Sequence, residues 1–217
     1  MKILFQGDSV TDAGRDKSNP NDMGEGYPKY ASAMIQDSFP DVEFEFYNLG
    51  ISGHRTEHLV QRLQSDFVDI QADIVSVLIG INEVWHHYAF EKIETTDADF
   101  EANLKTIFTA IKETMGAKLL VVQPFLLDVP DKRELREELN RKQAILDRLC
   151  ETYADAYLPM DEIFAGETAE EPTYYAADGV HPTSDGACYI GEAYLKAIIP
   201  LIESFLQEDE QHKPIDM

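Results

Sequence analysis

Positive charge is scarce in this sequence of 217 residues, because 18 Lys and Arg face 41 Asp and Glu and give a formal net charge of −23. Binding to nucleic acid needs a basic surface that neutralises phosphates, and adsorption to an anionic membrane needs one too. We therefore expect neither nucleic acid nor a membrane surface as a partner of this chain.

Cysteines and long apolar runs are also rare. Only Cys150 and Cys188 are present, without CxxC spacing, and we interpret them as free thiols in a reducing compartment rather than as a disulfide. No apolar run approaches the roughly 20 residues of a membrane-spanning helix, and the run at residues 3–5 is too short for the core of a signal peptide. The expectation is a cytoplasmic protein.

The overall composition is that of a globular chain, with 44% hydrophobic and 27% charged residues. A chain of this length usually closes around one core. We expect a single domain over residues 1–206. Residues 207–217 are acidic and have almost nothing to bury, which predicts a frayed tail.

Short apolar segments alternate along the chain with segments of helical periodicity. Strands are predicted at residues 3–5, 42–47, 74–79, 118–123 and 156–159. Helices are predicted at residues 27–38, 56–70, 100–115, 134–150 and 184–206. Pro200 is expected to kink or divide the last helix. This alternation predicts a three-layer α/β fold, with a parallel sheet that carries helices on both faces.

Ligands of such sheets bind beyond the carboxyl ends of the strands, and the sequence places polar segments at those positions. They are Gly7-Asp8-Ser9, Gly53-His54, Asn82-Glu83 and, before the final helix, Asp178-x-x-His181. Each segment alone is typical of a turn or a helix cap. Together they contain every part that transfer of an acyl group requires.

Ser9 is the candidate nucleophile, His181 its general base and Asp178 the carboxylate that orients the imidazole. The backbone N–H groups of Ser9 and Gly53, together with the side-chain amide of Asn82, are the candidate donors of an oxyanion hole.

Asp12 competes with Asp178 for the partnership with the histidine. The short spacing between Asp178 and His181 places both on one loop, which favours Asp178.

These four segments, in this order, resemble the SGNH (GDSL-type) hydrolase superfamily of esterases and acylhydrolases. The resemblance extends from Gly7 to Pro182 and implies a flavodoxin-like fold with a five-stranded parallel sheet. It also implies a carboxylic ester hydrolase that needs neither cofactor nor metal. The Gly-x-Ser-x-Gly elbow of α/β-hydrolases is absent.

Two stretches, residues 7–15 and 80–85, are similar to a branch of intracellular acetylxylan and other carbohydrate acetyl esterases, whose members are often oligomeric. Glu83 departs from the family, which usually has Asp after the Asn. We expect a serine esterase that removes acetyl or similarly short acyl groups from a small uncharged ester, such as an acetylated oligosaccharide. The alternatives are a lysophospholipase or thioesterase, and a non-catalytic flavodoxin-like module that binds phosphate.

Asp8, His54 and Trp85 are candidates for lining the substrate site. Asp8 either accepts backbone N–H bonds within its loop or interacts with Asn82, and the first role is favoured. Trp85, the only tryptophan, is either a platform for a sugar ring or a core or subunit-interface aromatic. His54 and His58 lie four residues apart, as metal ligands can, but no convergent Asp, Glu or Cys accompanies them, so no metal is expected.

The segment after Asn82 is rich in aromatic and histidine side chains. Trp85, Tyr88 and Phe90 could form a contact between copies of the chain in a homo-oligomer. His86 and His87 are interpreted as surface or interface residues.

Overall fold

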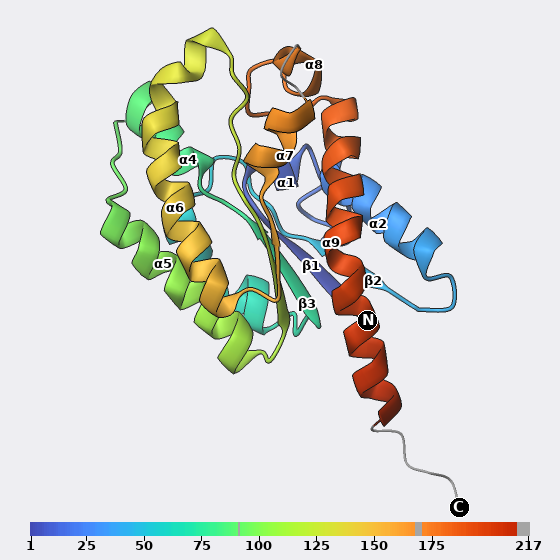
Figure 1. The fold of residues 1–217 in the computed structure, drawn as a ribbon. Coiled ribbons are helices and arrows are strands. Elements are labelled where there is room, and N and C mark those ends of the chain that lie inside the picture. The colour runs from blue at the N-terminus through green and yellow to red at the C-terminus, as the bar shows by residue number, and fades with distance from the viewer. Residues whose placement is uncertain (91, 168–170, 212–217) are drawn as a thin grey trace, which may run out of the picture.

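Five strands form one sheet in a computed structural model of the protein, which describes residues 1–90, 92–167 and 171–211. The strand order is β2-β1-β3-β4-β5, and every neighbouring pair is parallel. This is the flavodoxin-like order, so the predicted fold class is confirmed (Figure 1). The strands are β1 (Lys2–Gly7), β2 (Glu45–Asn48), β3 (Ile74–Leu78), β4 (Lys118–Val122) and β5 (Ala156–Leu158).

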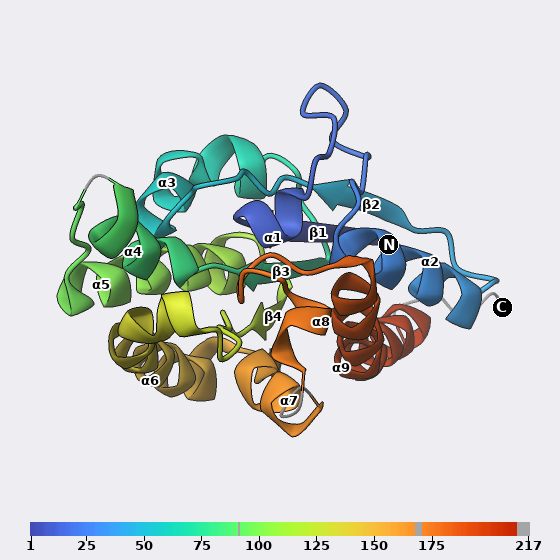
Figure 2. The same ribbon diagram turned by 90° about the horizontal axis from the view of Figure 1, so that it is seen from above.

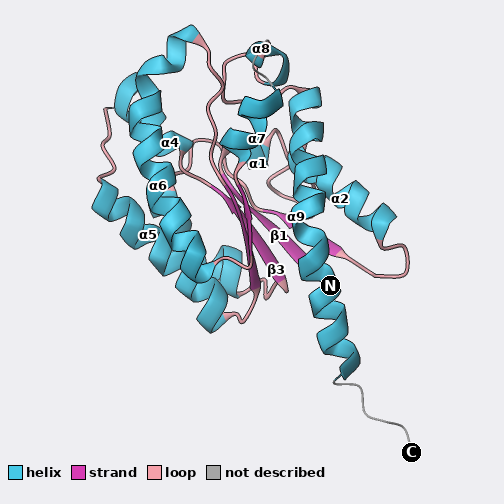
Figure 3. Ribbon diagram, viewed as in Figure 1, coloured by secondary structure: helices cyan, strands magenta, loops and turns pink. Residues whose placement is uncertain are grey.

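Helices connect the strands and make up most of the remaining chain (Figure 3). The α-helices are α1 (Ser9–Asp12), α2 (Tyr27–Ser38), α3 (Thr56–Gln61), α4 (Ile81–Trp85), α5 (Asp97–Thr109), α6 (Arg136–Tyr153), α7 (Met160–Glu167), α8 (Pro172–Tyr175) and α9 (Ser184–Gln211). Three π-helical turns and one 3-10 helix extend them: η1 (Gln64–Val68), η2 (His86–Phe90), η3 (Ala110–Thr114) and η4 (Pro130–Leu135).

The strands divide their side chains between two hydrophobic cores. On β1, Ile3 and Phe5 face one core, whereas Leu4 between them faces the other, as the two-residue period of a strand requires. Helices α2 and α9 cover the first core, and α3, α5 and α6 cover the second (Figures 1 and 2). The sheet is therefore the middle of three layers.

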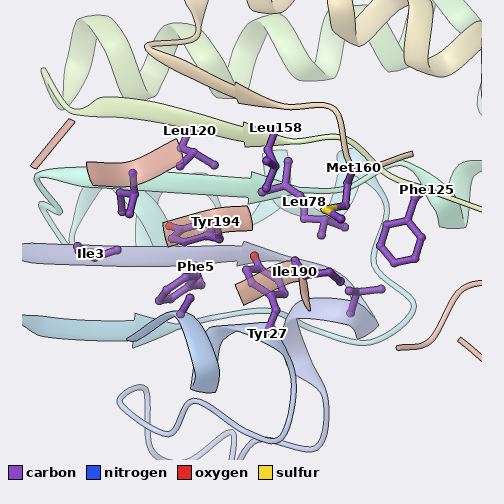
Figure 4. Close-up of a cluster of buried hydrophobic side chains, with 14 of the residues drawn as sticks. Ile3, Phe5, Tyr27, Leu78, Leu120, Phe125, Leu158, Met160, Ile190 and Tyr194 are labelled. Carbon is purple, nitrogen blue, oxygen red and sulfur yellow. The ribbon is translucent and has the colours of Figure 1, made fainter. Parts of the chain in front are cut away.

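Aromatic rings join α2 and α9 to β1 in the first core (Figure 4). Phe5 lies 5.8 Å from Tyr27 and 5.2 Å from Tyr194, measured between ring centroids. All three side chains are fully buried, and each such burial contributes roughly 1.5–3 kcal/mol to folding. The packing holds β1 firmly, and the end of β1 leads directly to Ser9.

Two predictions concern the closing helix. Pro200, expected to kink or divide it, lies inside α9 without dividing it. Because Pro200 is exposed, water can replace the hydrogen bond that its missing N–H would have made. The helix also continues through Gln211, so a frayed tail from residue 207 was the wrong prediction for residues 207–211. In this last part of the helix, Oε1 of Glu208 lies 3.1 Å from Nζ of Lys118. Residues 212–217 of the predicted tail fall outside the described residues.

The sequence did not predict the short helices α4, α7 and α8. The second strand begins at Glu45, whereas the prediction began it at residue 42. Both cysteines are free, as predicted. In the part of the chain that the structure describes, no helix has the length and apolar character needed to cross a membrane.

Candidate active site

Ser9 is the first residue of α1 and follows the carboxyl end of β1. Asp8 caps this helix, because its Oδ1 accepts the N–H of Val10 at 3.0 Å. Asp8 is completely buried, and the structural role predicted for it is confirmed. The cap fixes the direction in which the chain leaves the strand, and with it the position of Ser9.

A chain of hydrogen bonds connects Ser9, His181 and Asp178. The Oγ of Ser9 lies 2.9 Å from Nε2 of His181, and Nδ1 of His181 lies 2.7 Å from Oδ2 of Asp178. The other carboxylate oxygen of Asp178 accepts the N–H groups of Val180 and His181 at 3.0 and 2.8 Å. This geometry allows the imidazole to take the hydroxyl proton of Ser9 while Asp178 holds the ring in place.

The loop that carries Asp178 and His181 is attached to the segment after β4. The N–H of Leu127 donates to the carbonyl of Gly179 at 2.8 Å, and the N–H of Leu126 donates to Oδ1 of Asp161 at 2.9 Å. The loop is thus held against the carboxyl edge of the sheet.

The same hydrogen bonds determine the charges of the pair. The hydrogen bond to Asp178 raises the pKa of His181 above its ordinary value, although partial burial acts in the opposite direction. Burial would raise the pKa of Asp178, but the bonds from the His181 ring and from the backbone of His181 and Val180 outweigh it and lower that pKa. Asp178 is therefore charged at neutral pH, and His181 is a stronger base than a free imidazole.

The two other predicted oxyanion donors lie on segments that touch each other. Gly53 has φ of +80°, a left-handed conformation that a residue with a side chain rarely adopts. The amide Nδ2 of Asn82, on α4, donates to the carbonyl oxygen of His54 at 3.0 Å. One N–H of the Asn82 amide thus binds the residue next to Gly53, which leaves its second N–H for another acceptor.

Asp12 has a different role from the one weighed for it. Its Oδ2 accepts the backbone N–H of Ser52 at 2.8 Å and the Ser52 hydroxyl at 2.7 Å, and lies 3.2 Å from Nζ of Lys17. Asp12 therefore ties α1, which begins at Ser9, to the loop that contains Gly53. The sequence carried no signal for this contact between Asp12 and Ser52, because local patterns do not show which loops pack together.

The histidines of the second segment stack on each other. The ring centroids of His54 and His58 lie 4.6 Å apart. Burial, with the positive charges of Arg62 and His58 nearby, lowers the pKa of His54 to about 4. His54 is thus uncharged at neutral pH. Among residues 1–90, 92–167 and 171–211, no three His, Cys, Asp or Glu side chains gather into a group that could hold a metal.

Trp85 lies between a small hydrophobic cluster and the site. One part of it packs against the buried cluster that includes Ile81 and Val84, as the core interpretation predicted. Its ring centroid also lies 5.5 Å from that of His181, and Nζ of Lys132 lies 4.9 Å from the centre of the Trp85 ring. The partly exposed Trp85 ring is therefore next to the candidate base.

His87, which was interpreted as a surface or interface residue, is partly exposed and lies in η2, directly after α4. Its Nδ1 is 2.8 Å from Oε2 of Glu138, a buried carboxyl group on α6.

A hollow of about 260 Å³ opens beside Ser9 and His181. The other residues that line it are Val10, Ala13, Glu25, Gly26, Pro182 and Ser184. The N–H of Glu25 donates to the carbonyl of Ala13 at 2.9 Å, which joins the two loops that form one wall. Sequence analysis missed this wall, because loop residues without periodicity give no sign of where they pack.

A larger hollow, of about 430 Å³, lies at the opposite edge of the sheet, where Asp73 precedes β3 and Lys118 begins β4. Size alone would select it. Ser9 and His181 line the smaller hollow at the carboxyl edge instead, so that hollow is the candidate site, while Gly53 and Asn82 are not among its lining residues.

Comparison with known proteins gives consistent matches over nearly the whole chain. Residues 5–187 match the model of the GDSL-like lipase/acylhydrolase family. The chain is 28% identical over 206 residues to an acetylxylan esterase of Geobacillus stearothermophilus, which covers 91% of this chain and 93% of that protein.

Solved structures agree in fold. A protein of Parabacteroides merdae described as a GDSL-like lipase has a TM-score of 0.85 and 26% identity, over 90% of this chain and 94% of that one. The structure of the G. stearothermophilus acetylxylan esterase has a TM-score of 0.82 and 26% identity, over 90% and 92%. A variant of that enzyme, described as an acetyl-xylooligosaccharide esterase, has a TM-score of 0.84 and 25% identity, over 91% and 94%.

Proposed function

The chain belongs to the GDSL-like lipase/acylhydrolase family and is a carboxylic ester hydrolase, and on that basis we propose that Ser9, His181 and Asp178 remove acetyl groups from small carbohydrates. The observation that carries the proposal is the hydrogen-bonded chain from Ser9 Oγ through His181 to Asp178, with distances of 2.9 and 2.7 Å. Family membership sets aside the non-catalytic binding module.

The reaction proceeds in two halves. In the first, Ser9 Oγ attacks the ester carbonyl carbon while Nε2 of His181 takes the hydroxyl proton. The carbonyl oxygen, now negative, accepts hydrogen bonds from the N–H groups of Ser9 and Gly53 and from the amide of Asn82. When the intermediate collapses, the bond to the alcohol oxygen breaks and His181 gives that oxygen its proton, which leaves an acetyl group on Ser9.

Water completes the reaction by the same steps. His181 takes a proton from the water as its oxygen attacks the acetyl carbon, and the oxyanion forms again in the same place. Collapse returns the proton to Ser9 and releases acetate. Throughout, the negative charge of Asp178 stabilises the imidazolium form of His181, in keeping with the raised pKa of that histidine.

Two features support a short acyl group and a sugar alcohol. The hollow beside Ser9, at about 260 Å³, is smaller than the roughly 300–1,000 Å³ usual for ligand sites and has little room for a long chain. The partly exposed Trp85 ring beside His181 offers a flat apolar face, which suits the face of a pyranose. The similar proteins named as acetylxylan and acetyl-xylooligosaccharide esterases support the same substrate class.

Two assays test the proposal. A series of p-nitrophenyl esters from acetate to octanoate should give the highest kcat/KM with acetate, and a screen of acetylated xylo-oligosaccharides followed by NMR should show loss of acetyl signals. A kcat/KM that rises toward octanoate would instead favour a lysophospholipase or thioesterase. Ser9→Ala serves as the blank in both assays.

A further inference from the structure

Two consecutive residues of α4 bind the loop that carries Gly53. Asn82 donates through Nδ2 to the carbonyl oxygen of His54 at 3.0 Å, and Oε1 of Glu83 accepts the backbone N–H of Thr56 at 2.6 Å. The two contacts lie one and three residues after Gly53. We propose that Glu83 is a positioning residue for the oxyanion hole, which fixes the N–H of Gly53 relative to the amide of Asn82 by binding Thr56.

This inference deepens the proposed esterase function and rests on it. Glu83 contacts no reacting atom in the mechanism above; it acts through Thr56 and the loop. A donor to an oxyanion is effective only when it already points to the place where the charge develops. A displacement of about 1 Å can cost about 100-fold in rate, so the residue that sets the loop position also sets the rate.

The burial of Glu83 shows that the contact is not an incidental surface bond. The residue is completely buried, and its second oxygen, Oε2, is buried without a hydrogen-bond partner. A buried carboxyl group is costly, and an apolar side chain of similar volume would often stabilise a fold as well or better. The stability of the fold alone is therefore a poor reason for a glutamate here, whereas the position of the loop requires an acceptor.

Glu83 can accept the Thr56 N–H in either charge state, because a protonated carboxyl group keeps a carbonyl oxygen. Burial raises the pKa of Glu83, and the hydrogen bonds from Thr56 and the positive charge of Arg55 offset this only in part. Asp8 is the acidic group on the other side, because the charge of Glu83 contributes to the raised pKa of Asp8. Arg55 itself is buried and donates to Oγ1 of Thr95 at 3.0 Å.

The elements on both sides of this contact are well fixed. Ile81 and Val84 anchor α4 in a buried apolar cluster. Thr56 is also held through its side chain, because Nδ2 of Asn103 on α5 donates to Oγ1 of Thr56 at 3.1 Å. The hydrogen bond from Thr56 to Glu83 thus joins two rigid parts of the molecule, and the segment with Gly53 lies between them.

The test compares two replacements of Glu83 with p-nitrophenyl acetate as substrate. Glu83→Met keeps the side-chain volume but removes the acceptor, and should lower kcat by about 10- to 100-fold with little change in KM. Glu83→Gln keeps an amide oxygen that can accept the N–H of Thr56, and should retain kcat within about threefold. Asp73→Asn is the matched control, because Asp73 also accepts a backbone N–H, from Lys2 at 2.7 Å, but lies at the far edge of the sheet; its kcat should stay unchanged.

A second variant removes the same bond from its donor side. Thr56 is the first residue of α3, a position that tolerates proline, and Thr56→Pro deletes the N–H. It also removes Oγ1, which accepts from Asn103, so Thr56→Val, which keeps the N–H and loses only the hydroxyl, is its control. If both variants act through one hydrogen bond, kcat of the double variant Glu83→Met/Thr56→Pro should be about that of the slower single variant. Fully additive losses, or a Glu83→Met protein with wild-type kcat, would overturn the inference.

Failure of the proposed function would look different. In that case the wild-type protein itself would not hydrolyse p-nitrophenyl acetate, or Ser9→Ala would hydrolyse it equally well. A wild-type enzyme that depends on Ser9 but is indifferent to Glu83 would overturn only the positioning role.

Discussion

A single carboxylate oxygen of Asp12 accepts both the backbone N–H and the hydroxyl of Ser52, at 2.8 and 2.7 Å. Asp12 ends the short helix that Ser9 begins, and Ser52 directly precedes Gly53. The proposed nucleophile and one proposed oxyanion donor are thus held at a fixed separation by one side chain.

Replacement of Asp12 should therefore affect the rate as well as the stability. Asp12→Ala removes both hydrogen bonds, and we expect kcat for p-nitrophenyl acetate to fall by about tenfold and the free energy of unfolding to fall by about 1–3 kcal/mol. Lys17→Met, which removes only the ion pair to the same oxygen, should leave kcat unchanged. Equal kcat values for wild type and Asp12→Ala would show that the loop is held without Asp12.

The activity should fall on the acid side as His181 becomes protonated. Because the hydrogen bond to Asp178 raises the pKa of His181, the acid limb of kcat/KM should lie above pH 6.5, the ordinary value for histidine. Asp178→Asn removes the negative charge, so the limb should move to lower pH while kcat falls by about 10⁴-fold. A pH–rate profile of both proteins from pH 5 to 9 checks this; an unmoved limb in Asp178→Asn would assign it to another group.

Asp8 should make the fold less stable as the pH rises. Burial raises its pKa from 3.8 to about 7, so between these values the folded chain keeps a proton that the unfolded chain releases. The contribution of Asp8 to stability is fully present below about pH 4 and is lost as the pH rises to about 7. Asp8→Asn keeps the helix cap but has no proton to lose.

Urea unfolding at pH 4.5 and pH 8 measures this contribution. The free energy of unfolding of Asp8→Asn, minus that of wild type, should be larger at pH 8 than at pH 4.5. Asp41→Asn, which replaces an exposed carboxyl group, serves as the control and should show the same difference from wild type at both values. If Asp8→Asn behaved like this control, Asp8 would not hold a proton in the fold.

Trp85 should matter for sugars and not for simple esters. If its ring supports a pyranose, Trp85→Leu removes about 1 kcal/mol of stacking and should raise KM for acetylated xylo-oligosaccharides by about fivefold. The same variant should hydrolyse p-nitrophenyl acetate as wild type does. Tyr88→Leu, at an exposed aromatic three residues further on, is the control. Equal losses on both substrates would mean that Trp85 serves the packing around His181 instead.

The sequence predicted the fold and the main chemistry because both depend on signals that lie within short segments. The apolar run of β3 identifies a strand buried on both faces, and three of the four polar segments follow strands, whereas Asp178 and His181 lie on the loop before α9. Ser9 and His181 are 172 residues apart in the sequence, and their meeting was predicted from their complementary chemistry and from the resemblance of the four segments to one hydrolase superfamily.

The contacts that could not be predicted are those that depend on how loops pack. Nothing in the sequence indicates that Asp12 accepts from Ser52 or that Glu83 reaches Thr56, since local patterns do not show which segments pack together. The same reason hid the wall of the hollow at Glu25 and Gly26. Helices as short as α4 and α8 have too few residues to show an apolar stripe, and tertiary packing stabilises them instead.

The most direct test of the account is whether the acetyl group is carried by Ser9. The protein is mixed with excess p-nitrophenyl acetate, quenched in acid within milliseconds, digested and mapped by mass spectrometry. If Ser9 is the nucleophile, one acetyl group is present on Ser9 and disappears when the ester is exhausted, and Ser9→Ala shows neither the modification nor turnover. Turnover in Ser9→Ala, or an acetyl group that forms and clears on another residue, would contradict the account.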